Sequence, residues 1–363
     1  MRTSPPLRYA TTTDGVRIAY LSLGDGPPVV LASNIFGDAS GYYGGLPSNE
    51  IFDRLVALGW RVIMHDPRGM GGSDRNVEDH SLAARVRDVS AVIDALGLEH
   101  FAMGGLDIGA VTAVAYAVEH PHAVSRLMLA TPWASGARYL ALPALRAAYS
   151  AEASGENERK LFANIVMAVA SGFADPEIVR VGAELLLSRI SAATLKAYNK
   201  ANAHIDITDL LPRVSMPTLV THEPTFPFGS FELCQEVAAG IPNCEFVILG
   251  SKSIAGRDHD EGVAVADRFL RAGTATVVAK SSVEGAASLV GVYGLTSREI
   301  QVLRRVAAGA SNKEIAAQLD VAVSTVERHL VNIYNKIGAR GRADAIAFAL
   351  RSGIDASPSS SSR

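Results

Sequence analysis

The residue with the clearest potential for chemistry is Asp107, which stands in the run Gly105-Leu106-Asp107-Ile108-Gly109 between an expected strand and a helix of small residues, Ala110–His120. A carboxylate at such a sharp turn can attack a substrate and form an ester, which water activated by a histidine then hydrolyses. It can instead accept a hydrogen bond from a ligand hydroxyl, or only cap the helix that follows. The glycines let the chain turn sharply in every case. The partners of Asp107 therefore decide between these chemistries.

Segments that together cover most of residues 8–270 resemble the α/β-hydrolase superfamily. The Gly105–Gly109 run matches the nucleophile elbow, with Asp in place of Ser, as in haloalkane dehalogenases and epoxide hydrolases. Further matches are a D-x-R-G-x-G-x-S turn and the lead into a later strand, carried by Asp66, Arg68, Gly69, Gly71, Ser73, Asp209–Pro212 and Met216–Val220. The resemblance implies an α/β-hydrolase fold with a helical lid.

The partners that the resemblance implies for Asp107 are missing from their expected places. Phe226 falls at the position of the triad acid, and Glu223 lies too early to replace it. His259 is displaced by several positions from the expected base, and Ser33-Asn34 replaces the His-Gly of the oxyanion loop. Without a base within reach, a ~10²- to 10⁴-fold contribution to the rate is lost and an ester on Asp107 could not be cleared. We therefore expect no catalytic residues and a pseudo-hydrolase with a degenerate nucleophile position.

The pocket is nevertheless expected to persist as an apolar cavity with a few polar anchors. The backbone N–H groups of Ile35 and Ile108 would donate to a ligand carbonyl. The ancestry implies a small apolar ester, lactone, or phenolic or carbonyl compound as the ligand. The predicted ligand-binding residues are Asn34, Ile35, Phe36, Asp107, Ile108, Trp133, Phe226 and His259.

A second functional segment lies near the C-terminus, where apolar residues recur at helical spacing. The turn Asp320–Val323 is short enough to cross two helices steeply, as a helix-turn-helix requires. The expected N-caps are Thr296, Ser311 and Val323-Ser324, with Glu327 in capping-box spacing from Ser324. Four helices are predicted: Ser297–Ala308, Asn312–Leu319, Ser324–Ile337 and Arg342–Leu350. One apolar seam is expected to pack them: Ile315, Leu319, Val326, Leu330 and Ile333.

This segment closely resembles the LuxR-type (GerE) DNA-binding domain. The matches include Leu295, Thr296, Glu299, Gly309, Lys313, Ile315, Val326, His329, Asn332, Lys336 and Ile337. The resemblance implies that the third helix enters the major groove, with Glu327, Arg328 and Val331 at base edges. Glu327 stands where many relatives have Lys, so it would either accept from a cytosine amino group or orient Arg328.

The resemblance also implies roles for residues around the recognition helix. Phosphate contacts, or the register of the helix, would depend on Lys313, Thr325, His329, Asn332 and Lys336. Such domains dimerise through the fourth helix, for which Ala345, Ile346 and Ala349 offer an apolar stripe. A homodimer would bind double-stranded DNA at an inverted-repeat operator.

The chain alternates short β-branched runs with longer periodic segments, which is typical of a largely parallel sheet covered by helices. The predicted strands are Val16–Leu21, Pro28–Ala32, Arg61–His65, Phe101–Gly104, Ser125–Ala130, Thr218–Thr221 and Glu245–Leu249. The fold class is α/β, an α/β-hydrolase fold with a lid, followed by a small all-α domain of four helices. The expected boundaries are 1–272 for the first domain with a lid at about 134–212, 273–290 for a linker, 291–355 for the DNA-binding domain and 356–363 for a disordered tail.

Composition and charge limit the remaining classes. With 363 residues, of which 48% are hydrophobic and 20% charged, the chain can form two domains. No run of eighteen apolar residues or signal peptide is evident, so we expect a cytoplasmic protein without a membrane partner. Cys234 and Cys244 have no metal-ligand spacing, and neither a cofactor nor a metal is expected. The net charge of −3 is uneven, because residues 291–363 carry ten Lys and Arg against six Asp and Glu.

Together these features predict a ligand-responsive transcription regulator with a non-catalytic sensor domain. The expected partners are operator DNA, a small-molecule effector, a second copy of the chain and RNA polymerase. The alternatives are an active hydrolase with an Asp nucleophile fused to a DNA-binding module, and a dimeric regulator whose hydrolase fold is only a protein-interaction scaffold.

Overall fold

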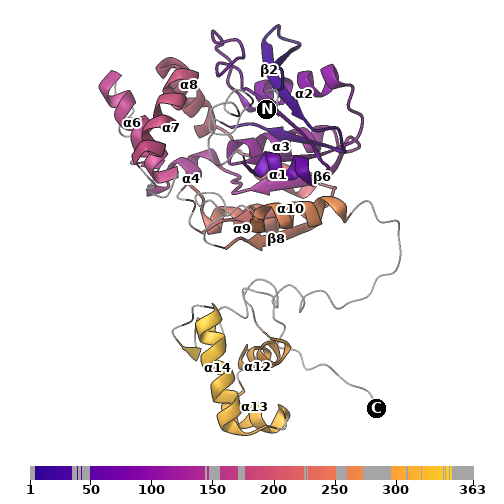
Figure 1. Cartoon of the computed structure of the whole chain (residues 1–363), viewed down its shortest axis with the longest axis vertical. Coiled ribbons are helices and arrows are strands. Elements are labelled where there is room, and N and C mark those ends of the chain that lie inside the picture. The colour runs from indigo at the N-terminus through magenta and orange to yellow at the C-terminus, as the bar shows by residue number, and fades with distance from the viewer. Residues whose placement is uncertain are drawn as a thin grey trace. The chain divides into compact units, whose positions relative to one another are not determined.

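The computed structural model divides the chain into two compact units, Met1–Thr276 and Val277–Arg363 (Figure 1). The described residues are 5–34, 39, 42, 50–143, 145–146, 156–170, 176–224, 226, 228–250, 260–272, 296–307, 310–319, 321–337, 339, 341–342 and 344–345. The predicted linker and tail lie outside this part of the chain, as do Ile35, Phe36 and His259 among the predicted site residues.

The first unit is built on an eight-stranded sheet in the order β1-β2-β4-β3-β5-β6-β7-β8. Strands β1 and β2 pair antiparallel with each other, β2 pairs antiparallel with β4, and the remaining pairs are parallel. The bounds are β1 Arg8–Thr11, β2 Arg17–Leu23, β3 Pro28–Ala32, β4 Arg61–His65, β5 Phe101–Leu106, β6 Val124–Ala130, β7 Thr218–His222 and β8 Cys244–Ile248. All seven predicted strands are confirmed, two of them to the residue, while β1 was not predicted.

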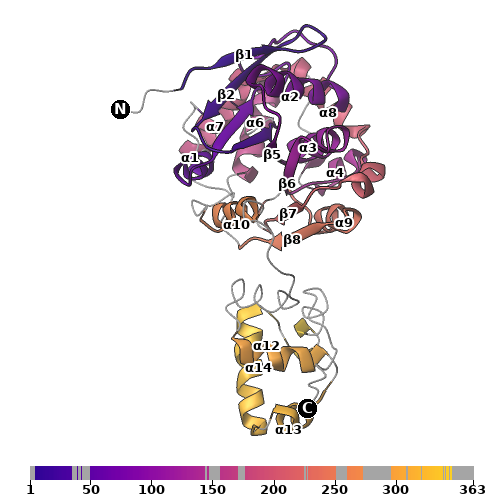
Figure 2. The same ribbon diagram turned by 90° about the vertical axis from the view of Figure 1, so that its right-hand side faces the viewer.

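Apolar residues alternate between the two faces of the sheet, and each face has its own helices. In β3 and β4, Val29 and Val62 pack with α1 (Glu50–Ala57) and α10 (Asp260–Arg271). The next residues, Val30 and Ile63, point to the opposite core. That core contains residues of α2 (Leu82–Leu96), α3 (Ile108–Glu119) and α9 (Phe231–Gly240). Figure 2 shows α1 and α10 on one side of the strands and α3 and α9 on the other.

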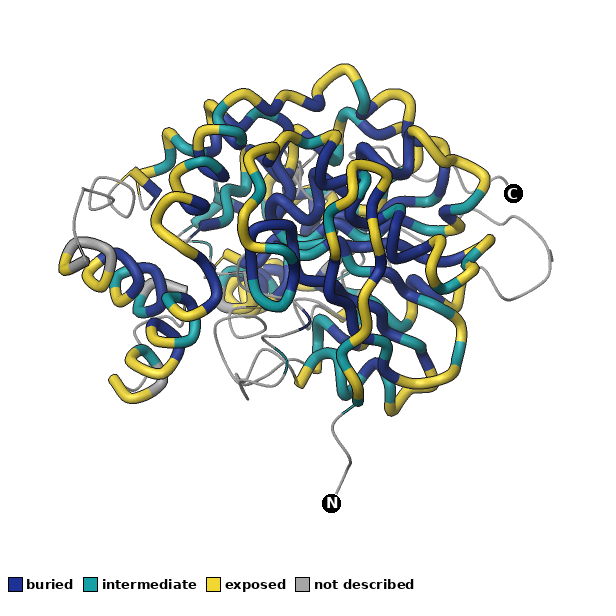
Figure 3. The backbone as a smooth tube through the Cα atoms, turned by 90° about the horizontal axis from the view of Figure 1, so that it is seen from above, coloured by how far each residue is buried: buried dark blue, intermediate teal, exposed yellow. Residues whose placement is uncertain are grey.

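The segment predicted as a lid is helical. It contains α4 (Gly136–Leu140), α6 (Glu156–Ala170), α7 (Pro176–Arg189), α8 (Ala192–Ala203) and the 3-10 helix η3 (Thr208–Arg213). Helices α6 and α7 pack against each other, and α4 packs against α8. Figure 3 shows the buried residues of this unit, in dark blue, concentrated toward its centre and the exposed residues, in yellow, around its periphery.

The second unit contains α12 (Ser297–Ala307), α13 (Asn312–Leu319) and α14 (Val323–Ile337), as predicted. Its described core consists of Val302, Leu303, Val306, Ile315, Ala316, Val326, Leu330, Ile333 and Ala345, with Leu319 packed against it. The predicted fourth helix lies mostly outside the described residues. Ala345 is fully buried inside this core, so its predicted place in an exposed dimer stripe is wrong. The side chain of Ala345 packs inside this unit and leaves no exposed surface for a partner.

Two helices of this unit begin with a reciprocal capping box. The Thr296 N–H donates to Glu299 Oε2 at 2.7 Å while the Glu299 N–H donates to Thr296 Oγ1 at 3.2 Å, and Ser311 pairs with Glu314 in the same way. The predicted box from Ser324 is wrong. Helix α14 begins one residue earlier, so the Ala322 carbonyl receives the first N–H bonds of the helix.

Within the part of the chain that the structure describes, no helix combines the length and the hydropathy needed to cross a bilayer.

Candidate ligand pocket and DNA-binding face

Asp107 lies at the carboxyl end of β5, at the apex of a sharp turn into α3. Its backbone has φ 57° and ψ −123°, in a region that side chains other than glycine rarely adopt. The flanking glycines have the steric role that the sequence predicts. A Cβ on Gly105 would lie 2.3 Å from the Gly109 carbonyl carbon, and one on Gly109 would lie 2.2 Å from the Ala32 carbonyl oxygen. The turn has the geometry of a nucleophile elbow.

A second strained residue follows the neighbouring strand. Thr131, directly after β6, has φ 44°, and its buried Oγ1 has no hydrogen-bond partner among the described residues. Asp107 and Thr131 are the two described residues other than glycine with positive φ. Such strain persists where the surrounding structure fixes it, and it clusters at functional sites. The two outliers mark the carboxyl edge of β5 and β6 as the candidate site.

The Asp107 carboxylate is bound by aromatic donors from the segment that follows β6. Trp133 Nε1 donates to Asp107 Oδ1 at 2.6 Å, and the Tyr139 hydroxyl is a second donor. The two rings stack, with centroids 4.9 Å apart and planes 12° apart. The backbone N–H of Ile108, at the start of α3, also acts on this carboxyl, so Asp107 contacts the helix start as well as the two aromatic donors.

Burial raises the pKa of the Asp107 carboxyl to about 6, against the opposing effects of the Trp133 and Tyr139 hydrogen bonds and the charge of Arg85. The side-chain donors that act on this carboxyl are an indole and a phenol, and neither is a base.

The other predicted pocket residues lie in different environments. Asn34 is buried and its Nδ2 donates to the Leu106 carbonyl at 3.1 Å, which holds the strand just before the elbow. Ile108 is buried in the core at the first turn of α3. Phe226 is buried and lies edge-on to Phe228, with ring centroids 5.8 Å apart. The structure thus brings Asp107, Ile108 and Trp133 together.

The end of β7 carries a histidine and an acid, although neither was predicted to function. His222 Nδ1 lies 3.7 Å from Cys234 Sγ, and its ring meets Phe231 edge-on. Burial raises the pKa of the Cys234 thiol to about 12, so the pair is not an activated nucleophile. Glu223 is completely buried. Among the described residues, no group of three or more His, Cys, Asp and Glu side chains could hold a metal ion.

Three polar residues near Asp107 were missed at the sequence level: Tyr139, Arg85 and Tyr198. The charge of Asp107 acts on both Arg85 and Tyr198, so the three side chains share one buried environment. They come from α4, α2 and α8, and no local spacing links them. The available signal was an arginine and an aspartate three residues apart, Arg85 and Asp88, among the apolar positions of α2.

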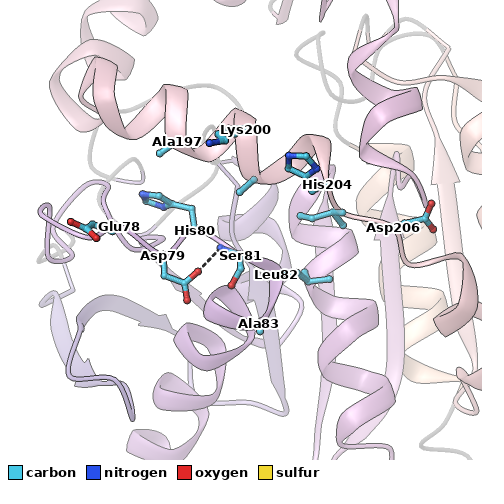
Figure 4. A pocket seen from close by; sticks show the side chains of 12 residues that line it. Glu78, Asp79, His80, Ser81, Leu82, Ala83, Ala197, Lys200, His204 and Asp206 are labelled. Atoms are coloured by element: carbon cyan, nitrogen blue, oxygen red, sulfur yellow. Dashed lines mark hydrogen bonds between the residues drawn. The ribbon is translucent and has the colours of Figure 1, made fainter.

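An open groove of about 710 Å³ lies between the segment Glu78–Ala83 and α8 (Figure 4). Its lining combines acids with the basic side chains of Lys200, His80 and His204. His80 reaches from this groove toward the interior, where its ring meets Tyr198 edge-on at a centroid distance of 6.3 Å.

In the second unit, the predicted base-reading residues lie on one exposed side of α14. Glu327 and Arg328 are exposed, and Val331 is 56% exposed although it is apolar. Among the predicted phosphate contacts, Lys313 and Asn332 are exposed and Thr325 and His329 are half-buried. Lys336 differs in having a charged partner within the same unit: its Nζ donates to the buried carboxylate of Glu299 at 2.7 Å.

Comparison with known families identifies a domain in each unit. Residues 294–349 match the model of the LuxR family of bacterial regulatory proteins, and residues 27–150 match the α/β-hydrolase fold. The chain therefore contains a LuxR-type DNA-binding domain and an α/β-hydrolase-fold domain. The fold class predicted from the sequence is confirmed.

Relatives of the LuxR-type domain are regulators. This domain is 44% identical to the HTH-type transcriptional regulator MalT of Klebsiella pneumoniae over 61 residues. The matched stretch is 17% of this chain and 7% of MalT. The domain is 43% identical over 60 residues to the transcriptional regulatory protein YdfI of Bacillus subtilis, which is 16% of this chain and 28% of YdfI. The chain therefore matches only a small part of each regulator.

Relatives of the hydrolase-fold domain are enzymes by name. A putative carbamate hydrolase, RutD of Escherichia coli, is 32% identical over 110 residues, which is 30% of this chain and 39% of RutD. An esterase structure from Exiguobacterium antarcticum covers 72% of this chain and 98% of its own, with a TM-score of 0.61 and 18% identity. At that identity the structural likeness shows the fold alone.

Proposed function

We propose that this protein is a ligand-responsive transcription regulator whose hydrolase-fold domain binds a small molecule and does not turn it over. The observation that supports this proposal is the environment of Asp107. It occupies a strained elbow like that of a working nucleophile, yet its carboxylate is bound to Trp133 and Tyr139. Both donors belong to the segment that enters the lid, so a ligand that displaces them would also move the lid.

The LuxR-type domain supplies the output. Two copies of α14 would read the half-sites of an inverted repeat, with Glu327, Arg328 and Val331 at the base edges. We propose a homodimer whose geometry depends on the ligand, and an effect on RNA polymerase recruitment. A coupling free energy of about 1–3 kcal/mol between ligand and DNA would suffice for a usable switch.

A test begins with the full chain and an operator selected from random DNA. A panel of named neutral compounds, including phenyl acetate, γ-butyrolactone and 4-hydroxybenzaldehyde, is scored for thermal shift, operator affinity and product formation. The proposal expects a compound that raises the melting temperature, changes operator affinity at least fivefold and is recovered intact. Conversion of a compound over multiple turnovers, lost in Asp107→Asn, would overturn the proposal that the domain is not catalytic.

An active hydrolase is the second candidate, and the retained elbow favours it. In that mechanism the Asp107 carboxylate attacks the substrate, and a base outside the described residues, such as His259, activates water. The same assay separates the two candidates, because His259→Ala would abolish turnover in the enzyme but leave ligand stabilisation unchanged in the sensor.

A further inference from the structure

Arg85 is the most unusual buried charge in the first unit. It lies on α2 with 4% of its surface exposed, and its Nε and both terminal nitrogens are buried without a hydrogen-bond partner in the described part of the chain. A guanidinium stays charged in proteins and carries five N–H donors. Burying such a charge without hydrogen bonds is strongly unfavourable, so the N–H groups of Arg85 call for an acceptor.

Tyr198 of α8 satisfies one face of the guanidinium. The Arg85 Cζ lies 3.9 Å from the centroid of the Tyr198 ring, in a cation–π contact. This contact involves the face of the Tyr198 ring and gives the Arg85 N–H groups no acceptor among the described residues. The Tyr198 hydroxyl is itself buried without a partner among the described residues. Two helices distant in sequence thus bring a buried cation and a buried hydroxyl to the same place.

The nearby acidic side chains already accept hydrogen bonds from other donors. Asp88 bonds to the Arg68 side chain, with Oδ1 2.9 Å from Nε and 2.8 Å from NH2. Asp107 accepts from Trp133 and Tyr139. Both carboxylates attract Arg85 across space and Arg68 repels it, but the Arg85 nitrogens bond to neither acid. His80, which packs on Tyr198, adds no negative charge.

We propose that Arg85 and the Tyr198 hydroxyl together bind a carboxylate group of the small-molecule effector. A carboxylate matches the fork of a guanidinium with two parallel N–H···O bonds and can accept a third bond from the phenol. This deepens the proposed function and rests on it. It narrows the effector from any apolar ester or lactone to a compound that also carries an acid, held close to Asp107.

The location connects binding to the lid. Arg85 belongs to α2, which packs on α3, whereas Tyr198 belongs to α8, which packs on α4. An anion bound to both residues would join the body of the domain to the lid, and α4 carries the Tyr139 that bonds to Asp107. The effector would therefore stabilise one lid position.

The experiment compares acids with their neutral amides on the full chain at pH 7.5 and constant ionic strength. The probes are acetate, benzoate and phenylacetate against acetamide, benzamide and phenylacetamide, read by thermal shift and calorimetry. The variants are Arg85→Met, which removes the charge, and Tyr198→Phe, which removes only the hydroxyl. Arg17→Met is the control, because Arg17 forms an exposed ion pair with Asp74.

We expect at least one acid to stabilise the protein while its amide does not, with affinity falling at least tenfold in Arg85→Met and threefold or more in Tyr198→Phe. The unliganded Arg85→Met should melt at or above the wild-type temperature, since no native hydrogen bond of the described chain is lost. Arg17→Met should bind as wild type.

The proposal is overturned if none of the acids, up to 100 mM acetate or 10 mM of either aromatic acid, gives stabilisation that depends on Arg85. It is also overturned if neutral amides bind equally well. Acid binding without any change in operator affinity would leave this site standing and reject the proposed regulatory function. Conversely, a neutral ester that changes operator affinity equally in Arg85→Met and in wild type would support the proposed regulatory function and reject the carboxylate site.

Discussion

The ammonium group of Lys336 lies 2.7 Å from the Glu299 carboxylate and joins the end of α14, the proposed recognition helix, to the start of α12. The sequence pattern predicts a phosphate contact for Lys336, and the structure shows a partner within the domain. Glu299 is buried, and it also accepts from the Thr296 N–H. Lys336 therefore stabilises the domain whether or not it reaches DNA.

Lys336→Ala should lower the free energy of unfolding of the LuxR-type domain by about 1–3 kcal/mol, because a buried acceptor loses its charged partner. Although burial opposes them, the bonds from Lys336 and Thr296 hold the pKa of Glu299 below its usual value. The contribution of Glu299 is thus present above its ordinary pKa and lost as the pH falls below it. Urea unfolding at pH 7 and pH 4 measures this. Lys313→Ala, at an exposed site, is the control and should change stability by less than about 0.5 kcal/mol. An equal effect of both variants would contradict the ion pair.

Arg328→Ala should weaken binding to the selected operator by about 1–3 kcal/mol and change binding to random DNA much less, because a bidentate contact to a base edge is lost. Arg328 is exposed on α14, so the folded domain should be unaffected. Fluorescence anisotropy measures the affinity of the variant for both DNAs. Arg304→Ala, which removes an exposed charge from α12, should affect the two DNAs equally. The same equality for Arg328→Ala would refute base reading.

Asp107→Asn should stabilise the hydrolase-fold domain in a pH-dependent way. The folded-state pKa of about 6 exceeds the ordinary value of 3.8, so the ionised carboxyl costs stability. The cost, on the order of 3 kcal/mol, is complete above pH 6 and disappears as the pH falls toward 4. The variant should therefore melt higher than wild type at pH 8 and close to it at pH 4.5. Asp94→Asn, which makes the same change at an exposed position, is the control. A difference that grows toward low pH would have the wrong sign.

Gly109→Ala should destabilise the hydrolase-fold domain by roughly 1–3 kcal/mol or more, because the new Cβ would meet the Ala32 carbonyl oxygen at 2.2 Å. Gly250→Ala is a matched control, since its Cβ would meet first the end of the flexible Glu261 side chain, at 2.8 Å. Calorimetry of both variants tests the steric role of the elbow glycine. Similar melting temperatures for the two would show that the elbow can relax.

The strands and helices could be predicted because their signals are local. Val29 and Val30, or Val62 and Ile63, alternate between two cores in a way that any apolar run in a covered parallel sheet must. The edge strand β1 was missed because its apolar residues are few: its burial pattern leaves Ala10 alone buried. The start of α14 was placed one residue late because Ser324 has the side chain of a cap, whereas the Ala322 carbonyl accepts the first N–H bonds of the helix.

By itself, the sequence determined the elbow at Asp107, the order of the elements and the exposed face of α14, since glycine sterics and periodicity act between neighbours in the chain. Only the tertiary structure decided which donors reach Asp107, that Lys336 bonds to Glu299 and that Arg85 stacks on Tyr198. These pairs join elements from 26 to 113 residues apart, and such contacts depend on how helices and strands pack, which no local pattern encodes.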